Sequence, residues 1–184
     1  MKFMIASDIH GSAVWCKRML DAFAASGADR LILLGDLLYH GPRNDLPEGY
    51  APKEVIALLS PLKQRLFCVR GNCEAEVDQM VLPFPVLADY AMMPLSTRMM
   101  MFTHGHHFHE HALPPLSAGD ILVYGHTHVP LCKETDGILC LNPGSVAIPK
   151  EQSPHSCMLL EGDTFSWLDL SSGTVFKTHI LPSA

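Results

Sequence analysis

Five short apolar runs in this chain each lead into polar side chains that can bind a metal ion, and this pattern limits the fold more than any other feature. The runs are Lys2–Ser7, Leu31–Leu34, Leu66–Val69, Met99–Thr103 and Ile121–Tyr124. Each spans only four to six residues before a polar residue or a glycine, which favours a buried strand over a helix. The polar side chains that follow them are Asp8 and His10, Asp36, Asn72, His104, and His126 with His128.

Two helices are predicted between the first three runs. Ser12 can cap the start of the first helix and Gly27 can end it. The second helix is predicted from Pro52, a residue favoured in the first helical turn, to Pro61. Strands and helices that alternate in this way favour a parallel sheet with helices on its faces.

The second half of the chain has a different pattern, with short β-like stretches separated by turn residues from about residue 129. These stretches are Lys133–Asp136, Leu139–Asn142, Ser156–Leu160, Thr164–Leu168 and Thr174–Ile180. They predict antiparallel or mixed strands and no further strand–helix units. Because no repeat or linker separates the two halves, we expect one domain over residues 1–184.

Composition excludes several classes of protein. With 48% hydrophobic and 17% charged residues the chain is not intrinsically disordered, and it has no apolar run near the ~18 residues that cross a bilayer. Asp8 interrupts the first apolar run too early for a signal peptide, so we expect a cytoplasmic protein without membrane contact. The net charge of −6 argues against an extended nucleic-acid surface.

Six cysteines without a CxxC pair are expected to be reduced and mostly buried.

Ligands bind an open α/β sheet beyond the carboxyl ends of its strands, so the five runs would direct two aspartates, one asparagine and four histidines into one cleft. Each motif alone has an ordinary explanation, since a D-x-H triplet occurs by chance and an aspartate after a strand is often a turn or cap residue. No glycine-rich nucleotide-binding motif is present. The five motifs together predict one metal site.

The order of these motifs resembles that of a known superfamily. Asp8-x-His10, Gly35-Asp36, Gly71-Asn72-x-Glu74, Thr103-His104-Gly105 and Gly125–His128 follow one another as in the calcineurin-like metallophosphoesterases, over residues 1 to about 150. Within that superfamily the chain is similar to the small YfcE-type bacterial phosphodiesterases, through the loop at residues 40–52, Cys73 and Asn142–Ser145. The resemblance implies an α/β fold, a four-layer αββα sandwich of two mixed β-sheets flanked by helices.

The resemblance also implies a site for two divalent metal ions, with Asp36 bridging them. One ion would be bound by Asp8, His10, Asp36 and His128, and the other by Asp36, Asn72, His104 and His126. Imidazole and oxygen ligands together suit manganese, which we expect, and also zinc or iron. Two such ions about 3.5–4 Å apart can hold both the attacking and leaving oxygens, and a hydroxide that bridges them would attack phosphorus. No nucleophilic side chain is expected.

Several residues are candidates for substrate contacts or proton transfer. Cys73 stands where the wider superfamily usually has a histidine thought to protonate the leaving group. A thiol is a weaker acid than an imidazolium group, so a catalytic Cys73 would favour substrates with good leaving groups. The alternative is that Cys73 only packs beside the site. Arg43 can bind two phosphate oxygens or make a surface ion pair. His106 can bind the phosphate or replace the missing acid, whereas His107, His109 and His111 are expected in solvent. Ser145 is expected to orient a ligand histidine.

We therefore predict a metal-dependent phosphodiesterase with a small-molecule substrate, with Asn72, Cys73 and His104 at the reacting phosphate. Two divalent ions and two aspartates leave two positive charges, which a hydroxide and a singly charged diester neutralise.

Three alternative functions remain. They are a phosphomonoesterase, a nuclease, which would need a basic track along the nucleic acid, and a non-enzymatic scaffold. A eukaryotic retromer subunit resembles the fold without all metal residues. A homo-oligomer could form through the β-rich C-terminal part.

Overall fold

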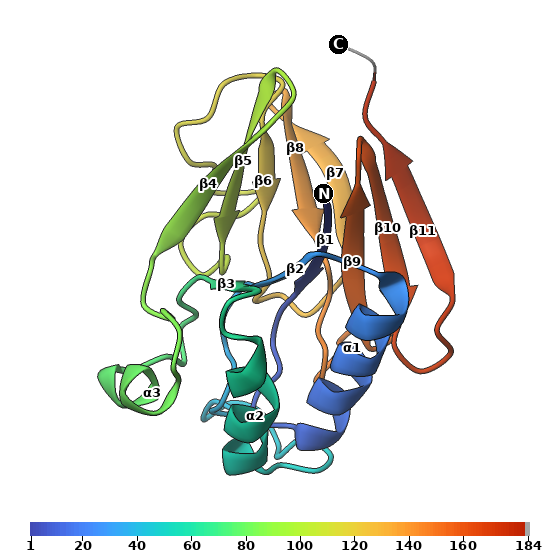
Figure 1. Cartoon of the computed structure of the whole chain (residues 1–184). Coiled ribbons are helices and arrows are strands. Elements are labelled where there is room, and N and C mark those ends of the chain that lie inside the picture. The colour runs from blue at the N-terminus through green and yellow to red at the C-terminus, as the bar shows by residue number, and fades with distance from the viewer. Residues whose placement is uncertain (183–184) are drawn as a thin grey trace.

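A computed structural model describes residues 1–182, which form two mixed β-sheets packed face to face (Figure 1). The first sheet has the strand order β11-β10-β9-β1-β2-β3 and the second β4-β5-β6-β8-β7. The first sheet contains β1 (Lys2–Ala6), β2 (Arg30–Leu33), β3 (Leu66–Cys68), β9 (Ser156–Glu161), β10 (Thr164–Asp169) and β11 (Val175–Ile180). The second contains β4 (Tyr90–Leu95), β5 (Arg98–Thr103), β6 (Ile121–Val123), β7 (Leu131–Thr135) and β8 (Ile138–Asn142).

The predicted strand–helix order of the first half is confirmed. Helix α1 (Ala13–Ser26) joins β1 to β2, helix α2 (Pro52–Leu59) precedes β3, and the three strands pair in parallel. The Ser12 hydroxyl accepts a hydrogen bond from the backbone N–H of Trp15, and Gly27 ends α1 with a φ of 67°. A single 3₁₀ turn, Ser60–Leu62, follows α2. None of the helices within residues 1–182 is long and apolar enough to cross a membrane.

Alternation along the strands divides the apolar core into layers. Met4 of β1 packs toward α1 and α2, whereas the next residue, Ile5, packs between the two sheets against side chains such as Phe102 of β5. The outer face of the second sheet buries Met101 and Tyr124 under an irregular segment at residues 104–118, which contributes Phe108. The predicted pair of mixed sheets is thus confirmed, with an irregular segment where the four-layer sandwich implies a helix over the second sheet.

Two elements were not predicted. Pro94 breaks the β pattern in sequence, yet it lies in β4, where it pairs with Met99 at the edge of the second sheet. A proline is tolerated there because an edge strand has one side without a hydrogen-bonding partner. Helix α3 (Glu76–Val81) buries none of its residues, so it lacks the apolar stripe by which a helix is recognised.

The carboxyl ends of β1, β2, β5 and β6 lie on one side of the molecule. The N–H of His10, after β1, donates to the carbonyl of Asp36, after β2, at 2.8 Å. In the second sheet the N–H of Gly125 donates to the carbonyl of His104 at 2.8 Å. A contact between the sheets completes the arrangement, since His104 Nδ1 lies 2.7 Å from the carbonyl oxygen of Leu34. The predicted cleft therefore forms between two sheets and is not the crevice of one open sheet.

Candidate metal centre

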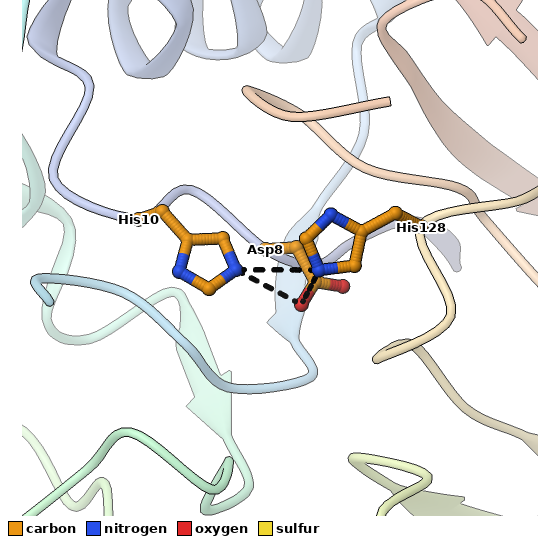
Figure 2. Close-up of side chains that lie close together, drawn as sticks. All are labelled: Asp8, His10 and His128. Atoms are coloured by element: carbon orange, nitrogen blue, oxygen red, sulfur yellow. Dashed lines mark hydrogen bonds and ion pairs between the residues drawn. The ribbon is translucent and has the colours of Figure 1, made fainter. Parts of the chain in front are cut away.

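Asp8, His10 and His128 point toward one another in a buried cluster, as Figure 2 shows. Asp8 Oδ1 lies 3.3 Å from His128 Nε2 and 3.5 Å from His10 Nε2, and the two Nε2 atoms are 3.4 Å apart. Asp8 Oδ1 has no hydrogen-bond partner, although its other oxygen accepts the N–H of His126 at 3.0 Å. Three donor atoms for a metal thus face one small volume.

The hydrogen bonds on the far side of each imidazole determine which nitrogen faces this volume. His10 Nδ1 lies 2.8 Å from the carbonyl oxygen of Tyr39, and His128 Nδ1 lies 2.6 Å from that of Ile148. Because a carbonyl oxygen only accepts, Nδ1 carries a proton in each ring, and Nε2 points toward Asp8. When both rings are neutral, their Nε2 lone pairs and the unpartnered carboxylate oxygen of Asp8 face one buried space, and this arrangement of donor atoms fits a divalent cation.

A second group of candidate metal-binding atoms surrounds His104. Its Nε2 lies 3.1 Å from Asn72 Oδ1 and 3.2 Å from His126 Nδ1. Asp36 Oδ2 lies 3.4 Å from His104 Nε2 and 3.6 Å from His10 Nε2, so it is within reach of both groups. The structure therefore brings together all seven residues predicted to bind metal, and it places Asp36 between the two halves.

Glu74, to which the sequence analysis gave no role, holds the Asp36 loop in place. Its buried carboxylate accepts the backbone N–H groups of Asp36 at 2.8 Å and Leu37 at 2.7 Å, and also that of Gly71. A Cβ atom at Gly71 would overlap Asp36 Oδ1. That oxygen instead accepts the N–H of Cys73 at 2.9 Å, which leaves Oδ2 for the candidate centre. The signal in the sequence was the glutamate three residues after Gly71.

Ser145 acts on His128 through the backbone. Its hydroxyl donates to the carbonyl of Asp8 at 3.0 Å and accepts the N–H of Ile148 at 2.9 Å. Ile148 in turn accepts the Nδ1 proton of His128. The expectation that Ser145 orients a histidine of the site is consistent with this chain of contacts.

Five of the seven candidate ligands have left-handed backbone conformations. Their φ values are 60° for Asp8, 48° for His10, 56° for Asp36, 66° for His126 and 63° for His128. Residues with a Cβ rarely adopt this region, and such residues concentrate at functional sites whose surroundings hold them in place. These positive φ values therefore mark the strand ends as a candidate functional site.

The charges of the centre act on one another. Burial opposes ionisation of Asp8, but the facing His128 and His10 outweigh it and lower the Asp8 pKa. Burial also opposes protonation of His104, but its contact with Asp36 and the charge of Asp8 raise the His104 pKa to about 9. Burial and the neighbouring His104 lower the His126 pKa to about 4. At neutral pH a proton therefore occupies the position at His104 that a cation would take.

Several of the candidate metal ligands line a cleft of about 610 Å³. Arg43 and Cys73, which are candidates from the sequence, line this cleft, and so does Lys150, which has no distinctive sequence pattern. Burial and the charge of Asp36 raise the pKa of the Cys73 thiol. His106 is not among the lining residues; its ring packs 5.4 Å from that of His104, centroid to centroid, and its Nδ1 is buried without a partner.

Comparison with known proteins agrees with this geometry. The calcineurin-like phosphoesterase superfamily domain matches residues 1–164, and the chain belongs to this superfamily. Its relatives include phosphodiesterase YfcE of Escherichia coli K12, 47% identical over 175 residues, which are 95% of each chain. The structure of the E. coli phosphoesterase Yfce superposes with a TM-score of 0.95 at 46% identity, over 99% of this chain and 100% of that one.

A more distant structure shares the fold alone. Vps29 of Entamoeba histolytica, in complex with zinc, superposes with a TM-score of 0.60 at 22% identity, over 98% of each chain. Membership of the superfamily implies that divalent metal ions bind this chain, and the two groups of candidate ligands provide a place for them.

Replacing Glu74 with glutamine tests its role in holding the Asp36 loop. The amide has one accepting oxygen where three backbone N–H groups need partners, so Glu74→Gln is expected to reduce the free energy of unfolding by about 1–3 kcal/mol. Urea unfolding of the metal-free protein measures this. Glu76→Gln, on the exposed side of α3, is the matched control and is expected to change little. Equal stability of both variants would contradict the role of Glu74.

Proposed function

We propose that this chain is a metal-dependent phosphodiesterase that hydrolyses small-molecule phosphodiesters with two divalent cations. The main support is that Asp36 Oδ2 lies between two groups of metal-binding atoms, 3.6 Å from His10 Nε2 and 3.4 Å from His104 Nε2. The similarity to phosphodiesterase YfcE supports the choice of a diester substrate. Mixed nitrogen and oxygen ligands favour manganese, with zinc or iron as alternatives.

Each cation has its own set of ligands in this proposal. Asp8, His10, Asp36 and His128 bind one cation, and Asp36, Asn72, His104 and His126 bind the other. When bound, the cations supply positive charge around the phosphate and the acidified water that attacks phosphorus. The protein fixes the directions of these ligands, because the proton on Nδ1 of His10, His104 and His128 is held by a backbone carbonyl.

Side chains beside the cations bind the substrate and assist the leaving group. Arg43 lines the cleft and can bind two oxygens of the phosphate through its planar guanidinium group. The Cys73 thiol stays protonated, since burial and Asp36 raise its pKa, and it can donate a proton to the leaving oxygen. As a weak acid it favours substrates with good leaving groups. A substrate contact of His106, which packs against His104, stays a prediction.

Two further expectations from the sequence stay predictions. One is the cytoplasmic location. The other is a homo-oligomer; β11 is an edge strand of the first sheet on which Phe176 and Ile180 are exposed, so it could pair with a second copy.

Turnover of two chromogenic esters tests the proposed function. Metal-stripped protein, with manganese, zinc or magnesium restored, is expected to hydrolyse bis(p-nitrophenyl) phosphate faster than p-nitrophenyl phosphate, with manganese the most effective. Release of p-nitrophenolate measures both rates. A faster monoester would favour the phosphomonoesterase alternative, and no turnover with any metal would favour the scaffold.

Removing the shared carboxylate tests the assignment of the ligands. Asp36→Ala is expected to lose both cations and to lower kcat/KM for the diester at least about 10³-fold, because both sets of ligands depend on this residue. Metal content after gel filtration and diester turnover are the measurements. Asp21→Ala, which removes an exposed aspartate of α1, is the control that keeps both. A variant at position 36 with normal metal content would show that Asp36 does not bridge.

The proton on His104 predicts how cation binding depends on pH. Because the His104 pKa is about 9, a cation must displace this proton below that pH. Affinity for manganese is expected to rise with pH by up to about tenfold per unit from pH 7 toward pH 9, and to level off above it. Titration calorimetry in buffers of different ionisation enthalpy measures both the affinity and the released proton. An affinity that is constant over this range would contradict the role of His104.

A further inference from the structure

The cleft has an unusual balance of charge beyond its candidate metal ligands. The charged side chains that line it, apart from those ligands, are Arg43 and Lys150, and Asp36 is its one acidic lining residue within residues 1–182. The chain as a whole has a net charge of −6. Arg43 and Lys150 add two positive charges to those of the metal ions. The cleft therefore has more positive charge than one singly charged phosphodiester neutralises.

Lys150 is fixed by the same turn that orients His128. Its backbone N–H donates to the carbonyl of His128 at 3.2 Å, and two positions earlier the carbonyl of Ile148 accepts the Nδ1 proton of His128. The Lys150 carbonyl accepts the N–H of Ser153 at 3.0 Å and its hydroxyl at 2.6 Å. The backbone of Lys150 is therefore held on both sides relative to the metal-binding atoms, although the side chain itself is exposed.

Arg43 has an equivalent attachment to His10. Tyr39, which accepts the Nδ1 proton of His10, leads directly into the turn that contains Arg43. Within this turn the Asn44 side chain donates to the carbonyl of His40 at 2.8 Å, and the Asn44 N–H donates to the carbonyl of Gly41 at 3.4 Å. Both cations thus extend from turns that orient the histidines of the Asp8–His10–His128 group.

We propose that Lys150 and Arg43 form an anion-binding subsite beside the Asp8–His10–His128 group. The preferred substrates are then phosphodiesters that have a further carboxylate or phosphate on one of their two alcohols. The inference rests on the proposed function and specifies its substrate class. Charge-assisted contacts to Arg and Lys are stronger than neutral hydrogen bonds, and the backbone of Lys150 is hydrogen-bonded directly to that of His128. A neutral substituent would leave Lys150 without an anionic partner, since Arg43 also faces the phosphate that is hydrolysed.

Three diesters with the same leaving group test this subsite. They are p-nitrophenyl propyl phosphate, p-nitrophenyl 2-carboxyethyl phosphate and p-nitrophenyl 2-(phosphonooxy)ethyl phosphate. The manganese-loaded protein is expected to hydrolyse at least one anionic ester with a kcat/KM about fivefold above that of the propyl ester, mainly through a lower KM. The identity of the better anion distinguishes a carboxylate from a phosphate. The preference is expected to shrink in 0.5 M salt, because partly exposed charges are screened.

Variants assign the preference to Lys150. Lys150→Met is expected to bring the ratio of kcat/KM between anionic and propyl esters close to one, whereas Lys150→Arg retains most of it. Lys63→Met, which removes an exposed lysine outside the cleft, is the control and retains the full ratio. Equal kcat/KM for all three esters, or a preference that survives Lys150→Met, overturns the subsite while the proposed function stands. Failure to hydrolyse any of the three overturns both.

Discussion

The candidate site depends on polar contacts between the two sheets at the ends of their strands. His104, after β5 of the second sheet, donates to the carbonyl of Leu34 after β2 of the first. In the opposite direction, Asp8 after β1 accepts the N–H of His126 after β6. Neither sheet holds all the proposed ligands of either cation, because each proposed set contains residues from both. The apolar layer between the sheets, which includes Ile5 and Phe102, therefore assembles the site as well as the fold.

These contacts hold the ligands in unfavourable backbone conformations. A residue held in a sparsely populated region costs about 1–3 kcal/mol, and five candidate ligands have a positive φ. The neighbours that keep them there are specific: the Glu74 carboxylate binds three N–H groups around Asp36, and the Ser145 hydroxyl connects Asp8 to Ile148. Bound cations offset the remaining cost, because they neutralise buried acceptor atoms that face one another. Folding thus produces a strained centre that is suited to metal.

The sequence was sufficient for the local pattern of the fold and for the set of residues that meet at the candidate site. Apolar runs that end in metal-binding residues predicted five strands and all seven residues that converge, and Ser12, Gly27 and Pro52 located two helices. Residues with no distinctive local pattern were missed. Pro94 concealed β4 because only its place at a sheet edge makes a proline acceptable there. Lys150 resembles any surface lysine until the fold places its turn against His128. Such roles arise from contacts between segments distant in sequence.

The distribution of charge explains how an acidic chain can act on an anionic substrate. Asp8 and Asp36 direct their carboxylates at the positions of the cations, and Asp36 is the one acidic residue among the cleft-lining residues within residues 1–182. Most of the net charge of −6 consequently lies outside the cleft. A nuclease needs a track of cations along its strand, because each phosphate contact adds to binding. Arg43 and Lys150, on two anchored turns, cannot follow a long nucleic-acid strand. In the proposed subsite they select a small diester that has one more negative group.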